Sequence, residues 1–161
     1  MICDLVSARL THVGPIASRI RDMDRIECEA LGRSPKDALR GGLRSSLDAY
    51  TALADGKPVA MIGVVPVSLI NGKGTIWMLG TDNVAAHARS LLKYGPILID
   101  HWLQTFETIE NIVALDNKLA INLIMKLGFT IDLCDFRVHG GVEFVPFHIE
   151  REPIQEDRQA A

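Results

Sequence analysis

The segment Thr108–Leu133 reads TIENIVALDNKLAINLIMKLGFTIDL and predicts a strand, a helix and a second strand with almost no residues between them. Thr108–Leu115 is a short apolar run rich in β-branched residues, which is typical of a buried strand. Asp116 stands where a helix needs an N-cap, because its carboxylate can accept hydrogen bonds from the free N–H groups of the first turn. Gly128 follows the helix, where a left-handed backbone costs glycine least. This βαβ-like crossover predicts an α/β fold.

The composition is typical of a single soluble globular domain. The chain has 161 residues, of which 48% are hydrophobic and 23% are charged, and this length suffices to bury a core. We expect one domain over residues 1–151 and a polar C-terminal tail over 152–161. No apolar run approaches the roughly 18 residues that a membrane-spanning helix needs. Asp4 interrupts the first apolar run and no basic region precedes it, so a secretion signal is not favoured.

Charge and residue spacing exclude some kinds of partner. The formal net charge of −3 argues against general nucleic-acid binding. Arginines and lysines gather between residues 19 and 44, but acidic residues intervene, so we interpret this part as a solvated helical face. The three cysteines and five histidines lack the paired spacing of metal ligands. We therefore expect reduced thiols in a cytoplasm and no metal.

The rest of the chain predicts a mixed, mostly antiparallel sheet flanked by helices. Asp55-Gly56 is a strong hairpin signal, and Pro66 predicts a bulge, a bend or an edge position within its strand. Gly41-Gly42 inside a helix indicates either close approach of another backbone or a ligand, or simply a weak helix. Gly95-Pro96 separates two predicted helices. The expected strands are 2–10, 48–54, 58–70, 75–79 and 143–149, and the expected helices are 11–21, 22–31, one from Pro35 capped by Ser34, 84–93 and 97–105.

This order of elements, with N-x-x-A at Asn117 and Ala120 followed by K-L-G-F at Lys126–Phe129, resembles the GNAT (GCN-five-related N-acetyltransferase) superfamily. The resemblance covers most of residues 2–150. It implies a sheet whose fourth and fifth strands splay apart, with acetyl-CoA in the opening. The pyrophosphate would be held by backbone N–H groups of the loop that leads into the next helix.

A narrower resemblance is to the small GNAT-like proteins of short-tailed bacteriophages known as internal virion protein A. It is carried by the stretches Asp55–Met61, Trp77–Thr81, His87–Arg89 and Leu127–Thr130. This resemblance implies a bacteriophage protein located in the host cytoplasm, with packaging into the virion left open.

The resemblance also implies a set of cofactor-binding residues. In the family the phosphate loop reads Q/R-x-x-G-x-G/A, whereas the corresponding segment Ser90–Gly95 reads SLLKYG, in which only Gly95 fits. Pro96 removes one further N–H donor. The residues implied to contact acetyl-CoA are Leu79, Gly80 and Thr81 near pantetheine, and Arg89, Lys93, Tyr94, Gly95, Asn117 and Ala120 near the phosphates.

The groups that the family uses for acid–base catalysis are missing. Ile124 stands at the position of the family's tyrosine, which acts as the general acid, and it cannot protonate a thiolate. The predicted strand 75–79 carries no carboxylate, which leaves Asp82 as a weak candidate for the general base. General acid–base help is worth roughly 10²- to 10⁴-fold in rate. The sequence therefore favours a degenerate site.

Three hypotheses remain open. The first is a bacteriophage GNAT-like protein with a degenerate acetyl-CoA site, which acts mainly through contacts with a phage or host protein, in the virion or in its assembly. The second is an active acetyl-CoA-dependent N-acetyltransferase that modifies a host protein or a small amine. The third is an inhibitor of a host enzyme that uses the arginine-bearing helices between residues 19 and 44. The oligomeric state is left open, and a homo-oligomer is compatible with each hypothesis.

Overall fold

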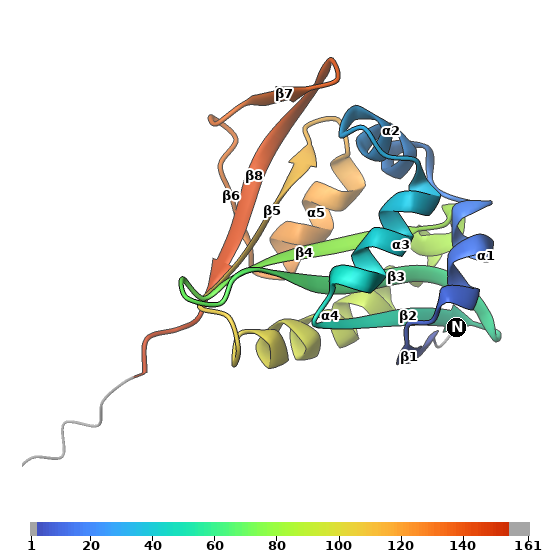
Figure 1. Ribbon diagram of the computed structural model, residues 1–161, viewed down its shortest axis with the longest axis horizontal. Helices are drawn as coiled ribbons and strands as arrows, with labels where there is room; N and C mark the ends of the chain where they lie inside the picture. The colour runs from blue at the N-terminus through green and yellow to red at the C-terminus, as the bar shows by residue number, and fades with distance from the viewer. Residues whose placement is uncertain (1–2, 155–161) are drawn as a thin grey trace, which may run out of the picture.

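A computed structural model describes residues 3–154, so most of the predicted polar tail lies outside the described residues (Figure 1). Eight strands form one sheet in the order β1-β2-β3-β4-β5-β8-β6, and β7 also pairs with β8. Every pair is antiparallel except β4–β5, so the predicted mixed and mostly antiparallel sheet is confirmed. The strands are β1 (Cys3–Ser7), β2 (Asp48–Ala54), β3 (Lys57–Ser68), β4 (Lys73–Gly80), β5 (Thr108–Ala114), β6 (Thr130–Ile131), β7 (Arg137–His139) and β8 (Val142–Glu150).

Helices cover both faces of the sheet. Those before β2 pack with Met61, Trp77 and Leu79 on one face, whereas those after β4 pack with Val64 and Ile76 on the other. Successive residues of a strand point to opposite faces, which is why the neighbours Ile76 and Trp77 pack against different sets of helices. The helical segments are η1 (Leu10–His12), α1 (Val13–Ala17), α2 (Asp22–Ala30), α3 (Pro35–Ser45), η2 (Asp82–His87), α4 (Ala88–Trp102) and α5 (Lys118–Lys126). No helix in the described part of the chain is long and apolar enough to cross a membrane.

The predicted strand–helix–strand segment is confirmed as β5, α5 and β6. Strand β8 lies between β5 and β6 and is antiparallel to both, so these two strands run in the same direction. Gly128 ends α5 with φ +94°. The predicted cap is wrong by one residue, because Asn117 rather than Asp116 accepts the hydrogen bond from Ala120 N at 3.3 Å. The amide of Asn117 is buried, whereas Asp116 lies further out, so burial selects the cap.

Local turn signals elsewhere in the sequence are also confirmed. Asp55 and Gly56 both have positive φ, at 49° and 73°, as a two-residue hairpin turn requires. The strand register shifts next to Pro66, which confirms the predicted irregularity. Ser34 caps α3 through a 3.1 Å bond from Asp37 N.

The other helix signals need two corrections. The helix predicted over 11–21 ends at Ala17, because Ile20 pairs with Thr81 in a β-bridge. The close approach at Gly42 is made by the Trp77 indole, since a Cβ there would lie 2.7 Å from that ring. The neighbour at Gly42 is therefore a side chain and not another backbone.

Pro96 does not start a new helix, and this prediction was wrong. Helix α4 runs from Ala88 to Trp102 through Gly95 and Pro96. A proline inside a helix costs about 3 kcal/mol. The burial of Leu98, Ile99 and Trp102 against the sheet offsets that cost. Segment Ser90–Gly95 is therefore helix rather than a loop.

Strands β4 and β5 splay apart, as expected from the resemblance. They pair only where Lys73–Thr75 meets Thr108–Glu110, although β4 continues to Gly80 and β5 to Ala114. The remaining residues of both strands diverge and leave a gap in the sheet between them.

Candidate functional site

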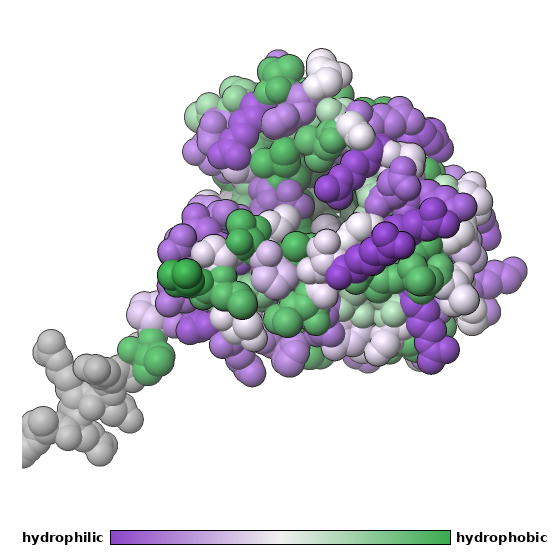
Figure 2. All heavy atoms as spheres, viewed as in Figure 1, coloured by the Kyte–Doolittle hydropathy of each residue, from purple (hydrophilic) through white to green (hydrophobic). Residues whose placement is uncertain are grey.

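A cavity of about 530 Å³ lies at the splayed ends of β4 and β5. A recess is visible in this region of the surface (Figure 2). Its volume is within the range of pockets that bind small molecules. Its charged lining comes from α2 and the turn after it: Arg21, Asp24, Glu27 and Arg33. Its apolar lining comes mainly from β4, α5 and β8 and includes Ile124, Leu127, Phe129, Phe144 and Phe147.

Asp24 joins α2 to the end of β4. Its side chain is 5% exposed, and its Oδ2 accepts a hydrogen bond from Gly80 N at 2.9 Å. Arg21 lies nearby, with its Nη2 3.9 Å from Asp24 Oδ1. Burial raises the pKa of Asp24, and the charge of Arg21 and the bond from Gly80 only partly oppose this. Asp24 therefore satisfies a strand-end N–H that has no partner strand.

Glu27 makes the equivalent connection to β5. Its Oε1 accepts hydrogen bonds from Ala114 N at 2.9 Å and from Asn117 Nδ2 at 3.0 Å. Burial raises the pKa of Glu27, although both hydrogen bonds lower it. Its Oε2 has no hydrogen-bond partner among residues 3–154. Glu27 thus retains one carboxylate oxygen that makes no hydrogen bond within the described residues.

Arg21 and Asn117 complete this network. Arg21 Nη2 donates to Asn117 Oδ1 at 2.9 Å, and the same oxygen accepts from Ala120 N. Both polar atoms of the Asn117 side chain are therefore occupied, and this residue is 2% exposed. The neighbouring Cys28 is buried, and burial together with nearby carboxylates raises the pKa of its thiol to about 11. The thiol is therefore neutral and unreactive near neutral pH.

The connection from β4 to α4 is the segment Thr81–His87, not the predicted Ser90–Gly95. Most of it is the 3-10 helix η2, and it contains no glycine. Its N–H groups have partners within the chain: Thr81 N donates to Val59 O, Asp82 N to Arg19 O, Val84 N to Thr81 O, and Ala88 N at the start of α4 to Ala85 O. These four N–H groups already have partners and so are not free to bind a pyrophosphate. The side chains of Thr81 and His87 each have one buried polar atom that finds no hydrogen-bond partner within the described residues.

The side of the sheet that α4 covers is nearly closed. A Cβ on Gly95 would lie 2.7 Å from Leu127 Cδ2, so α4 and α5 are in close contact there. A cavity of about 40 Å³ remains between α4, α5 and strands β1–β4, lined by Tyr94, His87 and apolar side chains. This volume holds a water molecule but no cofactor arm.

The predicted cofactor residues do not form one site. Leu79, Asn117 and Ala120 line the large cavity, whereas Tyr94 and Gly95 line the small one. Arg89 and Lys93 are exposed on α4, and Lys93 Nζ lies 5.4 Å from the Tyr94 ring centroid. Asp82, the weak candidate for a base, is exposed at the start of η2. Gly80 and Thr81 use their N–H groups within the protein.

Sequence reasoning missed the buried face of α2. Arg21, Asp24 and Glu27 follow at three-residue spacing, which places them on adjacent positions of one helix face. The interpretation of residues 19–44 as a solvated face holds for the exposed pair Arg25–Asp22 but not for these residues. The regular spacing was a visible signal, but nothing local distinguished the buried acids from the exposed ones.

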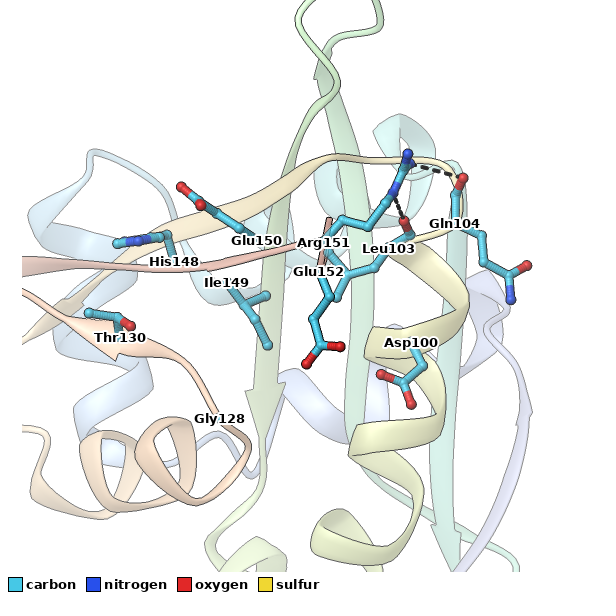
Figure 3. A pocket seen from close by; sticks show the side chains of 10 residues that line it. All are labelled: Asp100, Leu103, Gln104, Gly128, Thr130, His148, Ile149, Glu150, Arg151 and Glu152. Carbon is cyan, nitrogen blue, oxygen red and sulfur yellow. Dashed lines mark hydrogen bonds between the residues drawn. The ribbon is translucent and has the colours of Figure 1, made fainter. Parts of the chain in front are cut away.

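A second hollow lies at the closed end of the sheet (Figure 3). It measures about 770 Å³ and is formed by the C-terminal part of α4, the turn after α5 and the end of β8. Arg151 donates to the carbonyl oxygens of Leu103 and Gln104 and so caps the end of α4. Three acids, Asp100, Glu150 and Glu152, lie around it. None of the residues that the resemblance implies to contact acetyl-CoA lines this hollow.

Comparison with protein-family models and with curated protein sequences finds no match. Solved structures match along nearly the whole chain. One is the ribosomal-protein-S18-alanine N-acetyltransferase from Escherichia coli, with a TM-score of 0.67, 18% identity, and 97% of this chain and 98% of that chain covered.

Two further matches contain coenzyme A. AAC(6')-Ib in complex with ribostamycin and coenzyme A has a TM-score of 0.67 and 13% identity, with 100% of both chains covered. Spermidine N-acetyltransferase from Vibrio cholerae, in complex with CoA and spermine, has a TM-score of 0.62 and 14% identity, with 92% of this chain and 95% of that chain covered. At these identities the matches establish the fold alone, and the expected GNAT fold is confirmed.

Proposed function

We propose that this GNAT-fold protein is a bacteriophage protein that acts mainly through protein contacts, in the virion or in its assembly, with little or no acetyl transfer. The observation that carries the proposal is the segment Thr81–His87. The N–H groups of Thr81, Asp82 and Val84 bond within the chain, and α4 begins with an N–H already bonded to Ala85 O. These occupied donors support a degenerate site for the pyrophosphate of acetyl-CoA.

Two further features support this proposal. The close contact between Gly95 and Leu127 leaves only about 40 Å³ on the α4 side of the sheet. Ile124 lines the cavity at the position where the family's tyrosine would stand, and its side chain has no proton to give. A phage role itself is supported by the sequence resemblance to the internal virion protein A group.

The proposal is tested in phage particles and in infected cells. Mass spectrometry of purified particles should detect the chain in a fixed ratio to the structural proteins. Affinity purification from infected cells should recover a phage structural or assembly protein. Absence from particles, together with recovery of a host enzyme whose activity falls on binding, would instead favour the inhibitor hypothesis.

The second candidate function is an acetyl-CoA-dependent N-acetyltransferase with a host protein or small amine as acceptor. It is favoured by the cavity of about 530 Å³ and by Glu27, whose free oxygen can take a proton from an ammonium group. Turnover of radiolabelled acetyl-CoA by the full chain, lost in Glu27→Gln, would establish this function in place of the first.

A further inference from the structure

The backbone hydrogen bonds of the splayed strands can be accounted for residue by residue. Neighbouring residues of a strand direct their N–H and C=O groups to opposite sides. Thr81 N bonds to Val59 of β3, whereas Gly80 N and Ile76 O bond to side chains on the β5 side. Residues 76, 78 and 80 therefore direct their backbone groups into the gap.

The same reasoning applies to β5. Ala114 N bonds to Glu27, and Leu115 N bonds to Glu143 of β8. Ile112 is paired with Pro146, which has no N–H to donate. Ile112 and Ala114 therefore face the gap.

Side chains of the protein satisfy most of these gap-facing groups. Asn111 Nδ2 donates to Ile76 O, and its Oδ1 accepts from Ile112 N. Asp24 accepts from Gly80 N, and Glu27 accepts from Ala114 N. At both ends of the gap, side chains thus replace the missing neighbouring strand.

The N–H and C=O groups of Met78 and the C=O group of Ile112 remain. None of them has a hydrogen-bond partner across the gap among residues 3–154. Both residues line the cavity of about 530 Å³. Both residues are half-exposed, so water can reach these groups, and a ligand with a matching donor and acceptor can replace that water.

The shape and lining of the cavity define the rest of the ligand. The wall around Met78 is apolar and includes Ile124, Phe129 and Phe147, which suits a large apolar side chain. The opposite wall carries the free oxygen of Glu27 and the exposed Arg33, which can bind the charges of a neighbouring residue. The α4 side is nearly closed, so the ligand approaches from the α2–α3 side.

We infer that the cleft between β4 and β5 binds a peptide group of a partner polypeptide, through the N–H and C=O of Met78, with the adjoining large apolar side chain against the aromatic wall. This inference rests on the proposed function, since it identifies where and how the protein contact is made. It resembles β-strand addition, but it is limited to one peptide group because most of the other gap-facing groups are already satisfied.

The first test measures amide hydrogen exchange in the full, uniformly ¹⁵N-labelled chain by NMR. The Met78 amide should exchange about 100-fold faster than those of Trp77 and Leu79, which face β3. Adding N-acetyl-phenylalanine N-methylamide should shift the Met78 signal and slow its exchange. A Met78 amide already as protected as its two neighbours would overturn the inference without any variant.

The second test fills the cavity. Ile124→Trp should weaken binding of the same capped residue at least about tenfold, because the new indole occupies the apolar wall. Leu119→Trp is the matched control, on the same helix but outside the cavity and 44% exposed in the native chain, and should bind normally. Equal binding by both variants would contradict the proposed position.

Pantetheine and acetyl-CoA are titrated into the same sample to separate the two proposals. If pantetheine shifts Met78 and the capped residue does not, the peptide inference is wrong. If neither probe shifts Met78, the inference is wrong while the proposed function stands. Acetyl-CoA turnover would remove the proposed function itself.

Discussion

Helices α2 and α4 both lie beside the splayed strands, but they make different contacts there. Helix α2 brings buried carboxylates, so that Asp24 and Glu27 accept from the last N–H groups of β4 and β5. Helix α4 is reached through a 3-10 segment whose N–H groups bond within the chain, and it closes on α5 at Gly95. The gap stays open on the α2 side and closed on the α4 side. The two sides of the splayed strands thus differ in how far they leave the opening accessible.

The largest expected loss of stability comes from removing the buried carboxylate of Asp24 on α2. Asp24→Ala removes the acceptor for Gly80 N and the carboxylate that forms an ion pair with Arg21. We expect the free energy of unfolding to fall by about 3 kcal/mol, measured by urea denaturation.

Asp22→Ala is the matched control, because Asp22 is an acid of the same helix but its side chain is 86% exposed. It should change the free energy of unfolding by no more than about 0.5 kcal/mol. If the two variants lost the same stability, the buried network would have no special role.

The α4 side is tested by Gly95→Ala. The added Cβ would lie 2.7 Å from Leu127 Cδ2, so the Leu127 side chain or one of the two helices has to shift. We expect a loss of about 2 kcal/mol in the free energy of unfolding. Gly14→Ala adds a Cβ with no atom within 4 Å, and should leave stability unchanged or raise it by up to about 1 kcal/mol. Equal stability of the two variants would mean that the helix contact is loose.

The pH dependence of stability tests the burial of Glu27 on α2. The pKa of Glu27 is raised in the folded state above its ordinary value of 4.5. Between 4.5 and that higher value the folded chain binds more protons than the unfolded chain, so stability falls as the pH rises. Glu27→Gln keeps an acceptor for Ala114 N but cannot titrate.

The stability of the wild type relative to Glu27→Gln should therefore be highest at or below pH 4.5 and should decline as the pH rises through the folded-state pKa. Urea denaturation at a series of pH values measures this difference. A difference that grows with pH would mean that the carboxylate is held in its charged form by its partners rather than penalised by burial.

The smallest expected effect is at the exposed face of α4. Lys93→Glu reverses a charge that would be needed for phosphate binding at the start of this helix, but Lys93 is exposed on α4. We expect unchanged stability within about 0.5 kcal/mol and an unchanged calorimetric response to acetyl-CoA. A response present in the wild type and lost in the variant would place a phosphate site on α4 after all.

The parts of the fold that follow local signals were predictable from sequence. Strand β5, helix α5 with Gly128 at its end and the Asp55-Gly56 turn depend on neighbouring residues only. The path of α4 was not predictable, because Pro96 is a strong local signal for a helix start and only packing against the sheet overrides it. Because of that error, the phosphate-binding segment was predicted at Ser90–Gly95, which lies within α4, and not at Thr81–His87, which precedes it.

The charged wall of the cavity was not predictable for a different reason. Glu27 and Asn117 are 90 positions apart, and the bond between them depends on the packing of α2 over the splayed strands. The same is true of Asp24 and Gly80, which are 56 positions apart. Position Ile124 was informative from the sequence alone, because the loss of a proton donor follows from residue type.

The most direct test of the account is isothermal titration of acetyl-CoA into the full wild-type chain, followed by an assay for transfer to an amine. The account predicts no saturable binding up to about 1 mM acetyl-CoA, because the N–H groups of Thr81, Asp82, Val84 and Ala88, around the start of α4, already bond within the chain. Sub-micromolar binding together with turnover would contradict it.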